Sequence, residues 1–272
     1  MTTEVNTDSA GITVYTDPFN KRIRIDDYHG ELSSVLKLLN RQIVEWVEKL
    51  IVKSRVEDVP WFLSQGFTCE AFIKNYYAGA DMYFVTRYFT AGRDRSDKWY
   101  EEQLILQRII SEPVVLEIPS ILDIKIATPA QARELSQLYH TVFKVYPTPV
   151  QEETYILKTI QEGTMYVYAE FEGTLVSATS AEVNRKYRNA ELTDCASHPS
   201  AEGKGYMKRL LFFLEQKLMQ EGVTCLYTIA RSQSYSMNKA FAQLGYTYGG
   251  RLVNNCFIYS GIEDMNVWYK SV

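Results

Sequence analysis

A short turn between a predicted strand and a predicted helix carries residue types that can hold a phosphate group. Residues 197–206 read Ser-His-Pro-Ser-Ala-Glu-Gly-Lys-Gly-Tyr. Gly203 and Gly205 permit positive φ and a close approach of the backbone to a ligand, and Lys204 adds a positive charge. The N–H groups and the dipole at the start of the following helix would then bind the phosphate. A lone GxG is often a plain turn, so the prediction rests on this context; Lys208 departs from GxGxxG, and no Walker loop is present.

The elements around this turn form a mixed α/β pattern. Over residues 122–272, hydrophobic periodicity and turn residues predict the order β-α-α-β-β-β-α-β-α-β-β. Thr128 and Pro129 supply an N-cap and a first helical residue for the first helix. The strand over 191–197 and the helix over 205–220 flank the turn. This order differs from a simple βαβ alternation.

The chain before residue 122 is predicted to form a tail, a smaller domain and a linker. Residues 1–10 read as a disordered tail, 11–95 as an α/β domain and 96–121 as a helical linker. Within the domain, apolar residues at helical spacing predict a helix over 32–53. The last of these residues, 50–52, could instead form a buried strand.

A faint internal repeat connects the two parts of the chain. Residues 62–67 (FLSQGF) resemble 241–246 (FAQLGY), and 81–85 (DMYFV) resemble 264–268 (DMNVW). The alternative is a chance similarity between segments in which a helix, a glycine and a strand follow one another. If the repeat is real, the N-terminal domain is half of a related fold without the phosphate-binding turn. We would then expect it to serve packing or dimer contacts, not chemistry.

Composition excludes several classes of function. The 272 residues are 46% hydrophobic and 23% charged, which is ordinary for a folded protein. A net charge of -4 predicts no broad basic face for nucleic acid. The four cysteines form no CxxC pair and the three histidines no ligand spacing, so we expect no metal. The N-terminus lacks the apolar core of a signal peptide, and no apolar run approaches the roughly 20 residues that span a bilayer. We therefore expect a cytoplasmic protein without membrane contact.

Residues 199–206 resemble the acetyl-CoA loop of the GNAT superfamily, whose usual form is Pro-x-x-Arg-Gly-x-Gly. The resemblance extends to the order of elements over 122–272. It implies a GNAT fold there, acetyl-CoA as cosubstrate and transfer of an acetyl group to a primary amine. Glu202 stands where the family usually has Arg. We expect this change to weaken coenzyme binding without abolishing it, because backbone N–H groups provide most of the binding.

Three further segments look more specifically like the β-lysine N-acetyltransferases. They are 146–149 (YPTP), 191–196 (ELTDCA) and 263–270 (EDMNVWYK), and this closer resemblance also covers the N-terminal region. It implies acetylation of the side-chain amine of L-β-lysine to N-epsilon-acetyl-β-lysine, a compatible solute, or osmolyte. The alternatives are another small diamine or amino acid, a protein or peptide substrate, and a catalytically silent acyl-CoA-binding regulatory module. A homodimer is compatible with each of them.

By the GNAT resemblance, the thioester of the coenzyme lies beside strand 191–197, where two carboxylates occur. Glu191 or Asp194 could accept the proton of the amine, directly or through water, and attract a cation. Residues three apart on a strand face opposite sides unless a bulge intervenes, so we expect one to line the pocket and favour Asp194. The alternative is that both are solvated or structural. Backbone N–H groups near Ala196 and Ser197 would meet the oxyanion.

The resemblance also implies a general acid and a set of coenzyme contacts. Many GNAT enzymes use a Tyr four residues before the helix-ending Gly to protonate the thiolate, and Phe241 stands there. Either no Tyr acts as the acid, or another residue such as Tyr235 does. Asn238 on the same helix is expected to touch the coenzyme, unless it is a plain exposed asparagine. The full set of expected coenzyme contacts is Ala196, Ser197, Glu202, Gly203, Lys204, Gly205, Tyr206 and Asn238.

Recognition of β-lysine would require acids for its two ammonium groups and donors for its carboxylate. Glu263 and Asp264 are the candidate acids, and Asn254, Asn255 and Arg251 the candidate donors. The alternative is that these residues are solvated groups at strand ends.

Overall fold

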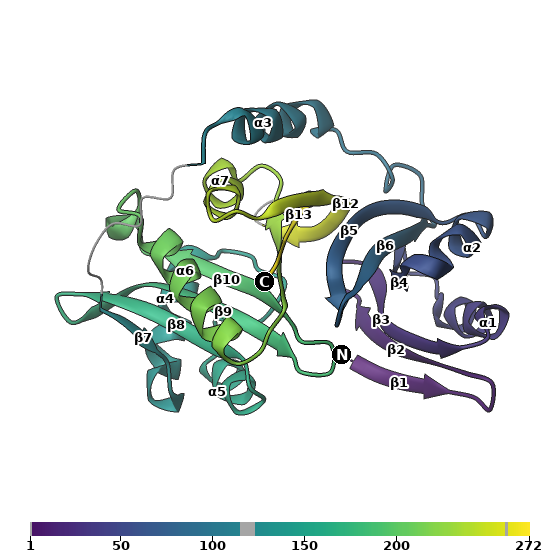
Figure 1. Cartoon of the computed structure of the whole chain (residues 1–272), viewed down its shortest axis with the longest axis horizontal. Coiled ribbons are helices and arrows are strands. Elements are labelled where there is room, and N and C mark those ends of the chain that lie inside the picture. Colours follow the sequence, from purple (N-terminus) through teal and green to yellow (C-terminus); the bar gives the residue numbers. More distant parts are fainter. Residues whose placement is uncertain (1, 115–122, 259–260) are drawn as a thin grey trace.

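The computed structural model describes residues 2–114, 123–258 and 261–272. The strands in these residues form one 13-stranded sheet in the order β1-β2-β3-β4-β6-β5-β12-β13-β11-β10-β9-β8-β7 (Figure 1). Two pairs, β3 with β4 and β10 with β11, are parallel. The predicted mixed α/β class is confirmed.

Two halves of the sheet repeat one arrangement. The N-terminal repeat contains β1 (Thr2–Asn6), β2 (Ala10–Asp17), β3 (Arg22–Gly30), α1 (Leu32–Gln42), β4 (Lys49–Arg55), α2 (Val59–Ser64), β5 (Thr68–Tyr77) and β6 (Ala80–Tyr88). The C-terminal repeat contains β8 (Met165–Phe171), β9 (Thr174–Asn184), β10 (Asn189–Ser197), α6 (Tyr206–Gln220), β11 (Cys225–Arg231), α7 (Tyr235–Gln243), β12 (Thr247–Ile258) and β13 (Gly261–Ser271). Both follow the chain order β-β-β-α-β-α-β-β and the sheet order 1-2-3-4-6-5, counted within the repeat. The internal repeat is therefore a structural duplication, and among the described residues the N-terminal repeat has no counterparts of β7, α4 and α5 of the C-terminal part.

Between the repeats lie α3 (Trp99–Ser111), β7 (Ile124–Ile126), α4 (Ala132–Val142) and α5 (Glu153–Gln161). Short 3-10 turns precede α2, α4 and α6, and the predicted Thr128 N-cap forms a capping box with Gln131. The predicted linker contains α3, which packs against α7. The predicted domain start near residue 122 lies outside the described residues.

Helices cover the C-terminal repeat on both faces (Figure 1). Leucines of α6 pack on one face, against a core that includes Leu192 of β10 and Leu226 of β11. Helices α4 and α5 pack on the other face, against Tyr166, Tyr168 and other residues of β8 to β10. They cover only that end of the sheet. Farther along the same face, the C-terminal repeat packs on the N-terminal one through the aromatic residues of a third core cluster.

Two sequence predictions for the N-terminal repeat were wrong. Residues 2–6, expected in a disordered tail of residues 1–10, form β1, which pairs with β2 in antiparallel register. Pairing of the backbone at the sheet edge does not require apolar side chains, and Val5 alone packs on the core. The helix predicted over 32–53 ends at Gln42, and β4 follows. Leu50, Ile51 and Val52 of β4 are buried between β3 and β6, so sheet pairing prevails over helical periodicity.

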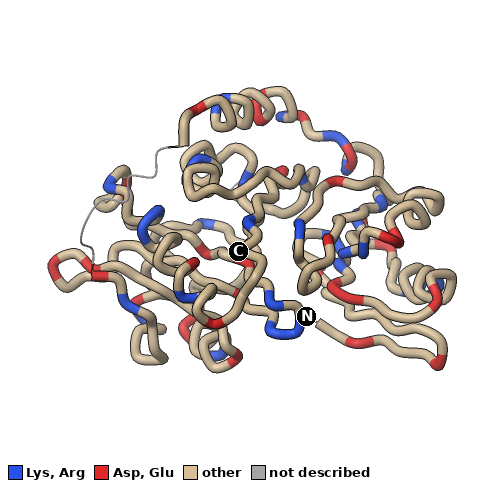
Figure 2. The backbone as a smooth tube through the Cα atoms, in the orientation of Figure 1, with Lys and Arg blue, Asp and Glu red and all other residues tan. Residues whose placement is uncertain are grey.

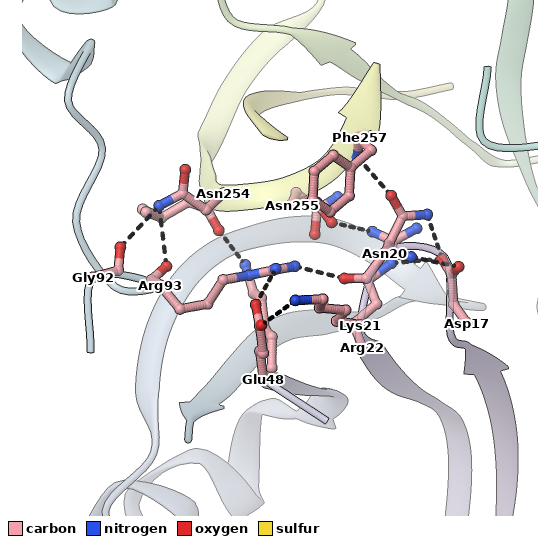
Figure 3. Close-up of polar contacts among 12 residues, drawn as sticks. Asp17, Asn20, Lys21, Arg22, Glu48, Gly92, Arg93, Asn254, Asn255 and Phe257 are labelled. Atoms are coloured by element: carbon pink, nitrogen blue, oxygen red, sulfur yellow. Dashed lines mark hydrogen bonds and ion pairs between the residues drawn. The ribbon is translucent and has the colours of Figure 1, made fainter. Parts of the chain in front are cut away.

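The two repeats join edge to edge through β5 and β12. At the contact, Gly250 pairs with Ala71. A Cβ at Gly250 would lie 2.4 Å from the carbonyl oxygen of Glu70, so only glycine permits this approach. Around the joint, side chains of one repeat bond to the backbone of the other: Arg22 Nη1 donates to the carbonyl of Asn255 at 3.0 Å (Figure 3).

The duplication also explains the similarity between 81–85 and 264–268. Asp81 accepts a hydrogen bond from the backbone N–H of Asn75 at 3.0 Å, and Asp264 accepts one from Asn254 at 2.7 Å. Both asparagines have positive φ, at 59° and 43°. The two aspartates therefore stabilise the same irregular backbone in corresponding hairpins.

Charges of both signs lie along both repeats and where the two meet (Figure 2). Within the described residues, no group of three or more His, Cys, Asp or Glu side chains is arranged to hold a metal ion. The helices of the same residues are all too short or too polar to cross a bilayer.

Candidate active site

The parallel strands β10 and β11 separate part-way along their length. Their paired residues run from Asn189 with Cys225 to Glu191 with Tyr227, and the pairing stops there. Both strands continue, to Ser197 and Arg231. Beyond the last pair, each strand presents a backbone edge that the other does not satisfy. Since backbone N–H and C=O groups need partners, these edges can bind an extended polar ligand.

Helix α6 begins at the turn that the sequence predicts to hold a phosphate. Gly203 and Gly205 both have a φ of 71°, and a Cβ on either would meet no atom within 4 Å. Gly205 is the N-cap, and no side chain caps the helix. Glu202 and Lys204 are exposed on the same turn, and Tyr206 opens the helix. Open space, uncapped N–H groups and positive φ at two glycines together fit a pyrophosphate group.

The corresponding helix of the N-terminal repeat is closed to such a ligand. Strand β3 leads to α1 through one residue, Glu31, which is the N-cap. Its carboxylate accepts the Ser33 N–H at 3.3 Å and the Ser33 and Ser34 hydroxyls at 2.5 and 3.2 Å. A carboxylate of the chain therefore caps the start of α1, whereas no side chain among the described residues caps the start of α6.

A β-bulge in β10 turns Asp194 toward the face that carries Glu191. The register with β9 shifts between Thr193 and Ala196, and Asp194 has a φ of 51°. Its Oδ2 accepts a hydrogen bond from Ser180 Oγ at 2.6 Å. Ser180 lies two residues before Glu182, whose partner in the ladder is Glu191. The expectation that only one carboxylate faces the pocket was therefore wrong, because the bulge brings both to one face.

Asp194 is buried and has the electrostatics of a base. Burial raises its pKa to about 6, and repulsion from Glu191 adds to this, although hydrogen bonds from Ser180 and Tyr146 lower it. Tyr146 belongs to the YPTP segment between α4 and α5, and its ring stacks on Phe143 at 4.1 Å. A carboxylate with this pKa is mostly ionised at pH 7 and can take up a proton.

Two more carboxylates lie next to Asp194 on this face. Glu182 and Glu191 are directly opposite each other in the ladder, and Tyr227 pairs with Glu191 on its other side. Burial raises the pKa of Glu182 to about 7, with further contributions from Glu191 and Asp194. The Glu182 side chain is nevertheless exposed. A carboxylate that lines a recess can be surrounded by protein atoms, which raises its pKa, and still be in contact with solvent. We call Glu182, Glu191 and Asp194 the acidic row.

The end of β10 presents the residues expected at the oxyanion. Ala196 is buried and Ser197 half-buried. Their positions are fixed from β9: Ser177 Oγ donates to the Ala196 carbonyl at 3.1 Å and lies 2.7 Å from Ser197 Oγ. Both residues follow the bulge directly and precede the α6 turn, so base, backbone donors and phosphate turn lie along one segment of chain.

Two candidates on α7 are used for packing instead. Asn238 is fully buried: its Nδ2 donates to two backbone carbonyls, and its Oδ1 accepts from Asn266 Nδ2 and Trp268 Nε1. The Tyr235 hydroxyl donates to Glu112 at 2.5 Å and accepts from Lys239 at 3.1 Å, which fastens the end of α3 to α7. These bonds occupy the Asn238 amide that was predicted to touch the coenzyme and the Tyr235 hydroxyl that was predicted as a candidate general acid. Phe241 is buried in the core.

The four substrate-binding candidates are structural as well. Asn254 Nδ2 donates to the backbone carbonyls of Gly92 and Arg93 (Figure 3) and to that of Arg95. Asp264 accepts a hydrogen bond from the Asn254 backbone N–H. Glu263 forms a bidentate ion pair with Arg231 at 2.8 Å, and Asn255 is 4% exposed. Arg251 is buried too, 3.5 Å from Glu102. The bonds of Asn254, Glu263 and Asp264 hold the β12–β13 hairpin in place, whereas Asn255 contributes its backbone carbonyl, which accepts from Arg22.

Sequence reasoning missed three residues of the site. Ser180 and Glu182 are spaced two apart on β9, which indicates one polar face of a strand, but pairing with β10 was needed to show which face. Tyr146 was noticed only as part of a family-like segment. Its bond to Asp194 depends on the position of the α4–α5 loop over the sheet.

Comparison with known proteins agrees with this geometry. A model of the acetyltransferase (GNAT) family matches residues 131–246. N-acetyltransferase YodP of Bacillus subtilis is 36% identical over 269 residues, which is 97% of this chain and 98% of that protein. The chain belongs to the GNAT acetyltransferase family. This acetyltransferase transfers an acetyl group from acetyl-CoA to an amine, as the sequence predicted.

The acetyltransferase is similar to two further proteins at different levels. A β-lysine N(6)-acetyltransferase of Methanococcus maripaludis is 38% identical over 254 residues, covering 92% of this chain and 93% of that protein. The likeness thus includes the N-terminal repeat. In fold alone, the ribosomal-protein-S18-alanine N-acetyltransferase of Escherichia coli matches with a TM-score of 0.50 at 16% identity, over 56% of this chain and 94% of the other.

Proposed function

We propose that this acetyltransferase acetylates the side-chain amine of L-β-lysine and so produces N-epsilon-acetyl-β-lysine. The observation that carries the proposal is the acidic row, because Glu182, Glu191 and Asp194 together suit a substrate with two ammonium groups. The relative from Methanococcus maripaludis, which carries the name β-lysine N(6)-acetyltransferase, supports it. A cytoplasmic location, a homodimer and the predicted domain boundaries remain predictions.

In this proposal the residues of the chain divide the work between proton transfer and binding. Asp194 takes the proton from the side-chain ammonium, directly or through one water, while Ser180 and Tyr146 hold its carboxylate in place. Glu182 and Glu191 attract the second ammonium group. Two like charges directly opposite in a ladder are destabilising, and a cationic substrate relieves that repulsion.

The coenzyme contacts follow from the open backbone. The α6 turn with Gly203, Lys204 and Gly205 would hold the pyrophosphate, and the separated edges of β10 and β11 the chain that leads to the thioester. Acetyl-CoA, when bound, supplies the activated acetyl group. Backbone N–H groups at Ala196 and Ser197 would stabilise the oxyanion. Glu202 is exposed beside the turn, so the loss of the usual Arg leaves these backbone donors in place.

A thiol-release assay tests the proposal. The purified chain with acetyl-CoA is given β-lysine, L-lysine, other small diamines and a lysine-containing peptide, and mass spectrometry locates the acetyl group. We expect β-lysine to be preferred and modified at its side-chain amine. No thiol release across the panel, with coenzyme binding intact by calorimetry, would instead indicate the silent regulatory module; preference for the peptide would indicate a protein acetyltransferase.

A further inference from the structure

The N-terminal repeat presents a cationic counterpart to the acidic row. Arg24 is the third residue of β3, where it pairs with Tyr15 of β2 and Ile51 of β4. Glu191 is the third residue of β10, where it pairs with Glu182 of β9 and Tyr227 of β11. Arg24 and Tyr15 therefore occupy, in the duplicated sheet, the positions of Glu191 and Glu182.

Contacts between the repeats bring the two positions together. Lys53 Nζ donates to the Tyr76 hydroxyl at 3.0 Å, and the Tyr76 ring lies 5.5 Å from that of Tyr227, the neighbour of Glu191. The hairpin between β9 and β10 also reaches across, since Lys186 and Tyr187 both donate to Asp27 of β3 at 2.6 Å. Attraction to Glu191 contributes to the raised pKa of Arg24, in addition to the larger effect of Asp26.

Arg24 has N–H donors that its ion pair with Asp26 does not use. Asp26 pairs with Arg24 at 2.7 Å and with Lys53 at 2.8 Å, so one carboxylate is shared by two cations. The two hydrogen bonds to Asp26 use Nε and one terminal nitrogen of Arg24, out of five N–H donors. The Tyr15 ring supports the guanidinium at 4.9 Å, and the Arg24 side chain is 24% exposed. A carboxylate entering from solvent can reach the remaining donors.

We propose that Arg24, contributed by the N-terminal repeat, binds the carboxylate of the amino acid substrate and so selects amino acids over plain diamines. The inference rests on the proposed function. It assigns the repeat a role in specificity, whereas the sequence alone suggested packing or dimer contacts. A substrate lying between the repeats would meet acids on one wall for its ammonium groups and a guanidinium on the other for its carboxylate, which fixes its direction.

Three compounds and two variants test this inference. β-Lysine is compared with 1,4-diaminopentane, which has hydrogen in place of the carboxylate, and with β-lysine carboxamide. Arg24→Gln should raise the KM for β-lysine about 10- to 100-fold, the range expected when a charged hydrogen bond is lost, with little change in kcat. The same variant should leave kcat/KM for the diamine and the carboxamide within about threefold of wild type. Arg24→Lys should restore part of the preference for β-lysine.

The matched control is Lys21→Gln, which removes an exposed positive charge of the same repeat that pairs with Glu48. This variant should leave kcat/KM for all three compounds unchanged. Equal losses for β-lysine and the diamine in Arg24→Gln, or no loss for either, would overturn the inference. If that variant does not fold, the wild type still decides, because equal kcat/KM for β-lysine and its carboxamide would exclude carboxylate recognition. Absence of any wild-type activity on β-lysine contradicts the proposed function instead; the substrate that the panel identifies and its carboxylate-free analogue then take the same test.

Discussion

Replacing Asp194 with Asn should reveal whether this carboxylate is the base. Asn keeps the size and can still accept the hydrogen bond from Ser180 Oγ, but it cannot take up a proton. An alkyl ammonium has a pKa of about 10.4, so about 1 amine in 2500 is neutral at pH 7. A positioned base typically contributes about 10²- to 10⁴-fold. We therefore expect kcat/KM at pH 7 to fall about 10²- to 10³-fold, since water can partly replace the base.

The pH dependence separates a base from a binding residue. In the wild type, kcat/KM should fall below a pKa of about 6, because protonation of Asp194 removes the acceptor. In Asp194→Asn the fall in kcat/KM at low pH should vanish. The difference in kcat/KM from the wild type should shrink about tenfold for each pH unit of increase, until the substrate ammonium is itself deprotonated. Thiol release at pH 5.5 to 9.5 measures both profiles. Ser180→Ala is a second probe: it removes a bond that lowers the pKa of Asp194, so the acid limb should move to higher pH. A deficit that is the same at every pH would refute the assignment of Asp194 as the base.

Three further changes test the coenzyme turn and the buried charges. Gly205→Val should raise the KM for acetyl-CoA at least about tenfold, because a β-branched residue resists a φ of 71°; an unchanged KM with intact circular dichroism would exclude this turn. Glu202→Arg should tighten acetyl-CoA binding about two- to fivefold in calorimetry, with the gain lost in high salt, and a gain that is independent of salt would contradict an ionic contact. Glu102→Gln should flatten the fall in Tm with rising pH. Burial and then repulsion from Asp264 raise the pKa of Glu102 to about 8, so the folded chain holds a proton that the unfolded chain releases above about pH 4.5, and stability declines between these values; equal slopes in both proteins would contradict this.

The parts of the site that the sequence predicted correctly depend on neighbouring residues. The α6 turn is determined by Gly203, Gly205 and the helix that follows. These residues are neighbours in the sequence, so the turn can be predicted without knowing the fold. The choice of Asp194 as the base stays a prediction. The orientation of Asp194 depends on a bulge against β9, and a single strand does not reveal its bulges.

The failures have a common physical cause in the duplication. Asp264 and Asn254 are polar residues near strand ends, where an ordinary domain would expose them. In this chain they lie near the joint of the two repeats, where they bond to backbone groups of residues 92–95 and of the β12–β13 hairpin. Arg24 raised no signal because its proposed role depends on residues of β9 and β10, which lie far from it in the sequence. The strand order of the N-terminal repeat was equally hidden, since its pairing partners differ in sequence from those of the C-terminal repeat.

The carboxylate of Glu31 has a consequence for how many acetyl groups one chain can handle. A helix start that is already capped by a carboxylate of the chain gains nothing from an external anion. We therefore expect only the C-terminal repeat to bind acetyl-CoA. The expected binding stoichiometry is therefore one acetyl-CoA per chain. Because the N-terminal repeat does not have to bind acetyl-CoA, its residues are available to recognise the acceptor amine.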